Sequence, residues 1–136
     1  MDKMKIAIVG TVHQKGLEFL KDNEFEVLEL SNFNNQSLKN ELKFVDGILL
    51  RTTKLGESIL SHCTNLKIIS RHGVGYDNVD IDYLNRNKIA LGITSTSNAV
   101  SVAEHVMSFF IYLTKNLSLS DSLVKQGNFE RKSELP

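Results

Sequence analysis

The sequence contains a single cysteine, Cys63, among its 136 residues. One cysteine cannot form an internal disulfide, and the residues around Cys63 lack the Cys/His ligand spacing of a zinc site. We therefore expect a buried or half-buried, unreactive thiol and no metal. This cysteine usage fits a reducing compartment and predicts a cytoplasmic protein.

The chain also has no formal net charge at pH 7 and no long apolar run. The sixteen basic residues balance the sixteen acidic ones, and no basic block offers the charged surface of a nucleic-acid-binding protein. The longest apolar run, at 109–113, is too short to span a bilayer, and residues 1–5 lead into a strand rather than a signal-peptide core. We expect a soluble chain, one domain in size, whose partner is a small molecule rather than nucleic acid or membrane.

Short apolar segments alternate with segments of helical spacing. The expected strands cover residues 5–10, 25–30, 45–51, 66–70 and 88–93. The expected helices cover residues 14–23, 38–44, 55–63 and 81–87. Strands joined through short helices predict an α/β fold, a doubly wound parallel sheet of about five strands with helices on both faces. The strict alternation at 25–30 predicts a more exposed position in the sheet.

Polar groups follow three of the predicted strands. Arg51-Thr52-Thr53 follows the third strand, the turn Gly73-Val74-Gly75 follows the fourth, and residues 94–98 (Thr-Ser-Thr-Ser-Asn) follow the fifth. Parallel sheets bind ligands beyond the carboxyl ends of their strands, and glycine-rich turns there can present backbone N–H groups to an anion. These segments together predict a site for a carboxylate or a phosphate.

The glycine turn also has a plain structural interpretation. Gly-x-Gly is common at strand ends, and Gly73 and Gly75 without a third glycine supply only half of the dinucleotide-binding fingerprint. The following residues fit a turn and a helix start, with Asp80 as the N-cap and Asp82 in the positive first turn. Spacing alone leaves both a binding site and an ordinary turn open.

The segment 97–118 differs from the other predicted helices because it is apolar on more than one side. Its apolar residues are Val102, Val106, Met107, Phe109, Phe110, Ile111 and Leu113. A helix of this kind is expected to be buried more fully than one resting on a sheet, and so to need a second partner. Ser97 or Asn98 is the expected N-cap.

The four histidines do not suggest a general base. His105 follows Glu104 on the long helix, and we expect it to be a packed, hydrogen-bonded framework residue. We expect His72 to be a spacer in the glycine turn. His13 and His62 are expected at the surface or at helix ends, without partners.

Three segments, Leu50-Arg51-Thr52-Thr53, Arg71 to Asp80 and Ser97 to His105, match a known pattern in their residues, order and spacing. They resemble the D-isomer-specific 2-hydroxyacid dehydrogenase family, which includes D-3-phosphoglycerate, D-lactate and formate dehydrogenases. Residues 126–132 are similar to the family's approach to its nucleotide domain. The resemblance covers nearly the whole chain and is weakest before Val45.

The resemblance implies a flavodoxin-like substrate-binding domain at 1–96, an inter-domain and dimerisation helix at 97–118, and a polar segment at 119–136 leading to a Rossmann domain. That domain is not in this sequence, which has no Gly-x-Gly-x-x-Gly and no ribose-binding acid after one. The family's catalytic arginine, acid and histidine also lie there. We therefore assign no catalytic residue, and expect the chain alone to be inactive and to bind NAD weakly or not at all.

The resemblance also implies site residues. Backbone N–H groups at Val74 and Gly75 bind the substrate carboxylate, and Val74 also lies near the nicotinamide. Arg51 matches an arginine that reaches toward the substrate in phosphoglycerate dehydrogenases, and Asn98 matches an asparagine that contacts the carboxylate in formate dehydrogenases. Val102 corresponds to a residue packed near the nicotinamide ring.

Two functions remain open. The first is the substrate-binding portion of an NAD-dependent D-2-hydroxyacid dehydrogenase, which transfers hydride between nicotinamide and a small 2-hydroxy or 2-keto acid, with phosphoglycerate favoured by Arg51. The second is a stand-alone small-acid-binding or dimerisation module without catalysis. Both predict a homodimer through the long helix, whose apolar stripe would otherwise be exposed. The preferred acid and the choice between NAD and NADP depend on residues outside this sequence.

Overall fold

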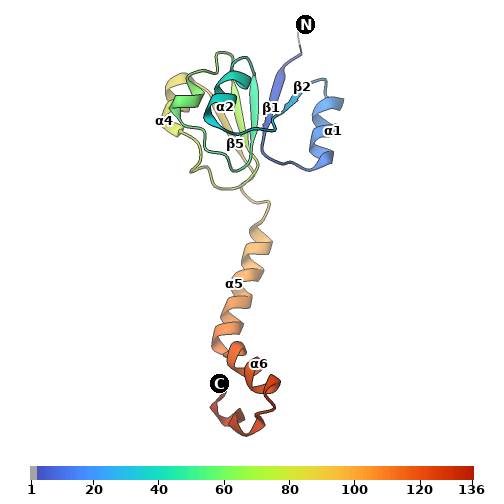
Figure 1. The fold of residues 1–136 in the computed structure, drawn as a ribbon, viewed down its shortest axis with the longest axis vertical. Coiled ribbons are helices and arrows are strands. Elements are labelled where there is room, and N and C mark those ends of the chain that lie inside the picture. The colour runs from blue at the N-terminus through green and yellow to red at the C-terminus, as the bar shows by residue number, and fades with distance from the viewer. Residues whose placement is uncertain (1–2) are drawn as a thin grey trace. The chain divides into compact units, whose positions relative to one another are not determined.

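The computed structural model describes residues 3–136, apart from the side chains of Lys132 and Glu134. Residues 1–2, which the sequence predicts to lead into the first strand, lie outside the described residues. The chain forms two compact units that divide between Ser95 and Thr96. The first contains the sheet and the second is helical (Figure 1). Whether segments 1–96, 97–118 and 119–136 are functional domains stays a prediction.

Five strands form one sheet in the first unit. They are β1 (Lys5–Val9), β2 (Glu26–Glu29), β3 (Gly47–Leu50), β4 (Ile68–Arg71) and β5 (Ala90–Ile93). All pairs are parallel and the order is β2-β1-β3-β4-β5. The predicted five-stranded parallel α/β fold is confirmed, and the alternating segment 25–30 forms β2, an edge strand with exposed ends.

Four helices connect these strands. They are α1 (Gln14–Asp22), α2 (Asn35–Glu41), α3 (Glu57–Leu60) and α4 (Ile81–Asn87). The helix expected at 38–44 begins earlier, because the Asn34 side chain accepts a hydrogen bond from the Ser37 amide at 2.8 Å and so caps α2. The helix expected at 55–63 is shorter, because Leu55 forms a parallel β-bridge to Val79.

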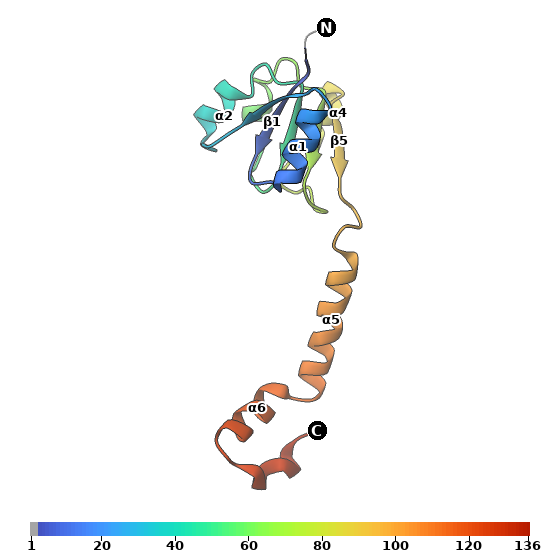
Figure 2. The same ribbon diagram turned by 90° about the vertical axis from the view of Figure 1, so that its right-hand side faces the viewer.

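The hydrophobic core lies on one face of the sheet. It joins alternate residues of the central strands to buried leucines of α2, α3 and α4, namely Ala7, Ile48, Ile69, Leu38, Leu60 and Leu84. Helix α1 lies on the other face, with Leu17 buried beneath it (Figures 1 and 2). On this second face Ile68 of β4 is 42% exposed, so within the first unit α1 covers only part of it.

Asp46 ties together the amino ends of three strands. Its carboxylate accepts hydrogen bonds from the Lys67 ammonium at 2.8 Å and the Lys5 amide at 2.9 Å. Its own backbone amide donates to the Lys5 carbonyl at 2.8 Å. The hydrogen bond from Lys67, and next that from Lys5, holds the pKa of the Asp46 carboxyl below its ordinary value of 3.8.

The second unit contains α5 (Ala99–Thr114), α6 (Leu117–Lys125) and a 3-10 helix (Phe129–Glu134). The single helix expected at 97–118 is divided, because Asn116 adopts a left-handed backbone with φ of 42° after α5 ends. The segment 119–136, expected only to be polar, contains most of α6. None of the helices in residues 3–136 has both the length and the apolar character needed to cross a membrane.

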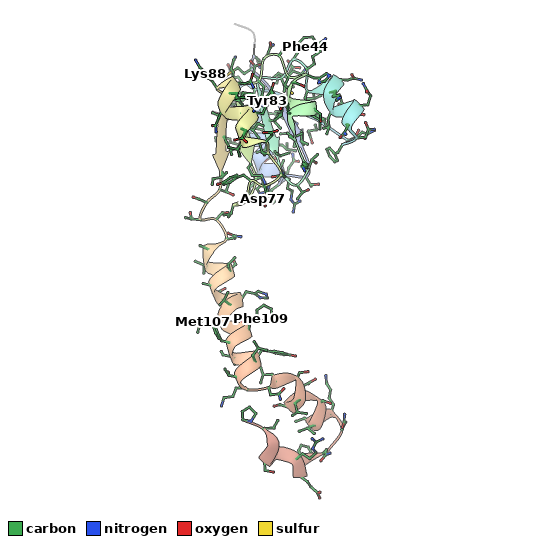
Figure 3. The ribbon with its side chains drawn as sticks, turned by 90° about the vertical axis from the view of Figure 1, so that its left-hand side faces the viewer. Phe44, Asp77, Tyr83, Lys88, Met107 and Phe109 are labelled. Atoms are coloured by element: carbon green, nitrogen blue, oxygen red, sulfur yellow. The ribbon has the colours of Figure 1, made fainter. Side chains whose placement is uncertain are left out.

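Helix α5 departs from the expectation of burial. Every one of its residues is exposed, including Phe110 at 60% and Leu113 at 72%. Met107 and Phe109, labelled in Figure 3, belong to the same uncovered surface. The apolar pattern therefore identifies the residues that need a partner, while the described chain does not supply one.

Replacing Asp46 with asparagine should lower the free energy of unfolding at pH 7 by about 1 kcal/mol, because a charge-assisted hydrogen bond is lost at a partly exposed site. The lowered pKa means that this stabilisation is complete above pH 3.8 and is lost as the pH falls through the native value. Urea unfolding at pH 7 and pH 3 should show a difference between Asp46→Asn and the wild type that shrinks at pH 3. The exposed pair Asp121–Lys125 supplies the control, since Asp121→Asn should change stability little at either pH.

Candidate functional site

The turn after β4 begins a run of backbone amides that have no partner in the described part of the chain. The His72 amide donates to the Leu50 carbonyl at 2.7 Å, and the Gly73 amide donates back to the Arg71 carbonyl at 2.9 Å. The next five amides, those of residues 74–78, have no hydrogen-bond acceptor within residues 3–136, and they include the Val74 and Gly75 amides that the family resemblance implies as carboxylate ligands. Val74 is 38% exposed and Gly75 is also exposed. Adjacent free N–H groups of this kind can hold an oxyanion.

The side chain of Asn78 joins this turn to the end of β3. Its amide nitrogen donates to the Thr53 carbonyl at 2.9 Å and to the Arg51 carbonyl at 3.3 Å. Its oxygen accepts a hydrogen bond from Nε of Arg71 at 3.2 Å. Because Nε of arginine can only donate, this contact fixes which end of the Asn78 amide faces the two carbonyls. One side chain thus holds both loops of the site.

The backbone around Asn78 reinforces this link. The Leu55 amide donates to the Asn78 carbonyl at 2.8 Å, and the Asp80 amide donates to the Leu55 carbonyl at 3.1 Å. The Asp80 carboxylate accepts from the Tyr83 amide at 2.9 Å, which caps α4 as predicted. Its other oxygen accepts from the Glu57 amide at 3.3 Å, at the start of α3.

Two guanidinium groups occur at this edge without a carboxylate partner. No salt bridge within the described part of the chain involves Arg51 or Arg71. Arg51 is exposed and its Nη1 reaches the Thr11 carbonyl at 3.4 Å. The Arg71 guanidinium donates to the His72 carbonyl and lies where a side chain on Gly73 would collide with it. The edge therefore carries positive charge that an anion can use.

Asp77 is the opposing charge nearest to the turn. It is exposed and lies at the end of the first unit where the strands finish (Figure 3). One of its carboxylate oxygens would be 3.6 Å from a Cβ placed on Gly75. The negative charge of Asp77 therefore repels an anion at the turn, and the attraction of the two arginines must exceed this repulsion.

A small cavity of about 200 Å³ opens beside the turn. Leu49 and Ser70 of the sheet line it on one side, Arg71 and His72 come from the turn, and His13 comes from the start of α1. A volume of this size suits a small molecule better than a dinucleotide.

The structure brings together three of the five predicted site residues. Arg51, Val74 and Gly75 belong to the two loops that Asn78 connects. Asn98 and Val102 belong to the second unit and lie one helical turn apart, with the Val102 amide donating to the Asn98 carbonyl at 2.9 Å. Asn98 is the N-cap residue of α5 by position, but its side chain makes no capping hydrogen bond. The ligand roles of all five residues stay predictions.

Sequence reasoning did not identify Arg71 and Asn78 as site residues. Both were part of the segment that carried the family resemblance, yet an arginine at a strand end and an asparagine in a turn each have ordinary explanations. The signal that could have found them is their spacing of seven residues across the glycine turn. That spacing lets the two side chains meet behind it, as their hydrogen bond shows.

The remaining candidates have structural roles. Cys63 is half-buried, as expected, and burial raises the pKa of its thiol to about 11. His13 has a partner that was not expected, since its Nδ1 accepts the Lys15 amide at 3.2 Å and caps α1. His105 packs edge-on against Phe109 with ring centroids 4.4 Å apart, but it is exposed and not hydrogen-bonded through its ring to any described residue. No group of metal-binding side chains occurs among residues 3–136.

Comparison with known sequences gives one family match. The model for "D-isomer specific 2-hydroxyacid dehydrogenase, catalytic domain" matches residues 6–126. D-3-phosphoglycerate dehydrogenase of Archaeoglobus fulgidus is 28% identical over 130 residues, which are 95% of this chain and 25% of that protein. The corresponding enzyme of Bacillus subtilis is 28% identical over 128 residues, 93% of this chain and 24% of that protein. The chain thus spans about a quarter of the length of these relatives.

Solved structures give the same picture. A protein of Pyrococcus horikoshii matches with a TM-score of 0.87 at 25% identity, over 98% of this chain and 40% of that one. D-lactate dehydrogenase of Aquifex aeolicus, complexed with NAD and lactic acid, matches with a TM-score of 0.79 at 27% identity, over 97% and 40%. NAD-bound 3-phosphoglycerate dehydrogenase of Entamoeba histolytica matches with a TM-score of 0.71 at 29% identity, over 82% and 39%.

Replacing Gly10 with alanine should destabilise the chain by more than about 1 kcal/mol, because its backbone conformation disfavours a side chain. Gly10 has φ of 119°, and its new Cβ would be 2.8 Å from Cβ of Arg51. Thermal unfolding measures the effect. Gly16 in α1 is the matched control, since nothing lies within 4 Å of its Cβ position, and Gly16→Ala should raise stability by up to ~1 kcal/mol. Equal effects of the two substitutions would contradict the close approach of Arg51 to Gly10.

Proposed function

The chain belongs to the D-isomer specific 2-hydroxyacid dehydrogenase family, and we propose that it is the acid-binding portion of a member that uses NAD. In this role the chain binds a small 2-hydroxy or 2-keto acid and orients it, while hydride transfer is the chemistry of the cofactor. A single cysteine, which cannot form an internal disulfide, suits a reducing compartment such as the cytoplasm.

One observation carries this proposal. The free amides of Val74 and Gly75 lie in a turn that hydrogen bonds connect to two arginines without carboxylate partners. A carboxylate is the ligand group that accepts hydrogen bonds from paired N–H groups and is attracted by nearby guanidinium charge. In the proposed complex the two amides bind the carboxylate, and the carboxylate-binding role that the family resemblance implies for Asn98 stays a prediction.

We favour phosphoglycerate as the acid. Arg51 remains available for a second anionic group once the turn holds the carboxylate, and its exposed position suits a phosphate at the outer end of the ligand. The relatives of Archaeoglobus and Bacillus are D-3-phosphoglycerate dehydrogenases. The structural relative that holds lactic acid shows that smaller acids are also bound by proteins of similar fold and sequence.

The residues present do not provide a full site for NAD. The turn contributes Gly73 and Gly75, but the position of the third glycine in the dinucleotide fingerprint is Asn78, whose side chain is committed to Arg51, Thr53 and Arg71. Val74 is exposed and offers apolar surface for a nicotinamide ring, and the contact that the family resemblance implies between Val102 and that ring stays a prediction. We therefore assign no catalytic step to this chain and expect it alone to bind NAD weakly or not at all and to be inactive.

A second candidate is a small-acid-binding or dimerisation module without catalysis. It is favoured by the exposed apolar surface of α5, where Val106, Phe109, Phe110 and Leu113 are all between 46% and 72% exposed. Apolar surface of this extent usually marks an association site. Under either function we propose that α5 joins two copies of the chain in a homodimer.

Titration with small acids tests the function. We expect D-3-phosphoglycerate, D-lactate and glyoxylate to shift the NMR signals of the Val74 and Gly75 amides, with D-3-phosphoglycerate binding most tightly because Arg51 contacts its phosphate. Arg51→Met should weaken D-3-phosphoglycerate binding about tenfold, the effect of one charge-assisted hydrogen bond, and should weaken D-lactate binding less, because lactate has no phosphate for Arg51 to contact.

Arg86 provides a control for that substitution, because it pairs with Glu57 at 3.0 Å on the surface of α3 and α4. Arg86→Met removes the same charge and should leave the affinity for all three acids unchanged. If inorganic phosphate shifted the same signals as strongly as the three acids, acid recognition would be disproved. If none of the three acids bound, the proposed acid-binding function would be disproved.

Sedimentation tests the homodimer. Phe110→Glu should convert the dimer to a monomer, because it places a charge on the apolar surface of α5. Phe44→Glu is matched in chemistry and exposure, since Phe44 is 61% exposed and Phe110 is 60% exposed, but Phe44 belongs to the first unit. A wild-type chain that stays monomeric at high concentration would rule out association through α5.

A further inference from the structure

The carboxyl edge of a parallel sheet exposes carbonyl oxygens as well as amides. At this edge the carbonyls of Arg51 and Thr53 follow β3, and the carbonyl of His72 follows β4. An uncapped carbonyl oxygen carries partial negative charge and repels an anion held nearby. Engaging such oxygens in hydrogen bonds therefore makes the turn more attractive to a carboxylate.

All three carbonyls are engaged by two side chains. The Asn78 amide nitrogen donates to the carbonyls of Thr53 at 2.9 Å and Arg51 at 3.3 Å, which uses both of its hydrogens. The Arg71 guanidinium donates from Nη1 to the His72 carbonyl. The Arg71 Nε also donates to the Asn78 oxygen at 3.2 Å, so each side chain fixes the orientation of the other.

We infer that Arg71 and Asn78 act together as positioning residues that cap these carbonyls and so make the edge favourable to an oxyanion. The inference rests on the proposed function, since the oxyanion is the carboxylate of the bound acid. Neither side chain needs to touch the acid. The pair leaves the Val74 and Gly75 amides free to bind the acid and puts a positive charge behind them.

The charge on Arg71 also counters Asp77. The Asp77 carboxylate lies near Gly75 and disfavours a second anion there. Within residues 3–136, Arg71 forms no salt bridge, so its charge is not neutralised by a carboxylate of the chain. The guanidinium lies against Gly73, one residue before the free amides, where its field acts at short range.

Asn78→Asp is the sharpest test because it preserves size and the acceptor for Arg71. It replaces the donor NH2 with an oxygen facing two carbonyl oxygens, so we expect D-3-phosphoglycerate and D-lactate each to bind at least about tenfold more weakly. Affinity is read from the NMR signals of the Val74 and Gly75 amides in the full chain. Thermal unfolding of each variant confirms that it is folded at the titration temperature.

Asn87→Asp is the matched control. The Asn87 side chain donates to the Tyr83 carbonyl at 2.9 Å at the end of α4, so the substitution makes the same chemical change away from the turn. It should leave the affinity for both acids unchanged. Equal affinities of the wild type, Asn78→Asp and Asn87→Asp would overturn the inference.

Substitutions of Arg71 separate hydrogen bonding and charge from packing, and they also cover the case in which Asn78→Asp fails to fold. We expect Arg71→Met to weaken acid binding about tenfold, and Arg71→Lys, which keeps a charge and a donor, to recover part of that loss. Equal affinities of the wild type and Arg71→Met would overturn the inference, because neither the hydrogen bonds nor the charge of Arg71 would then contribute to binding. A wild-type chain that binds inorganic phosphate as well as it binds the acids would refute the proposed function alone, provided that Asn78→Asp weakens both.

Discussion

The contact between segments 51–55 and 76–80 is the constraint on which the rest of the candidate site depends. The bridge between Leu55 and Val79, with the hydrogen bonds of Asn78, joins loops that follow two different strands. Loops at a sheet edge are ordinarily the mobile parts of an α/β fold. Here backbone groups of Leu55, Asn78 and Asp80 pair across the two loops, and the Asn78 side chain binds the carbonyls of Arg51 and Thr53, so the loop that carries Arg51 is joined to the segment that follows the glycine turn.

The sheet could be predicted because its evidence is local. Each strand is a short apolar run bounded by turn residues, and capping by Asp80 depends on the Tyr83 amide three positions away. The connection made by Asn78 could not be predicted from the sequence, because it spans 27 residues to Arg51 and forms only when β3 and β4 are in register. In the sequence an asparagine after two glycines is equally well explained as a turn former.

Helix α5 shows a different limit of sequence reasoning. Its apolar residues were identified correctly, but periodicity reports which faces avoid water and is silent on what covers them. The described chain leaves residues such as Phe110 exposed. The start of α5 shows the same limit. The sequence identifies Asn98 as a possible N-cap, and Asn98 does occupy the N-cap position, but its side chain makes no capping hydrogen bond.

Asp80 has a consequence for how the site can move. Its two carboxylate oxygens accept hydrogen bonds from backbone amides in the first turns of two helices, α3 and α4. The salt bridge between Arg86 and Glu57 joins the same two helices. A helix of four residues such as α3 has little stability of its own. We therefore expect the two helices to unfold locally as one cooperative unit, and the bridge between Leu55 and Val79 connects the segment that follows the glycine turn to the segment that precedes α3.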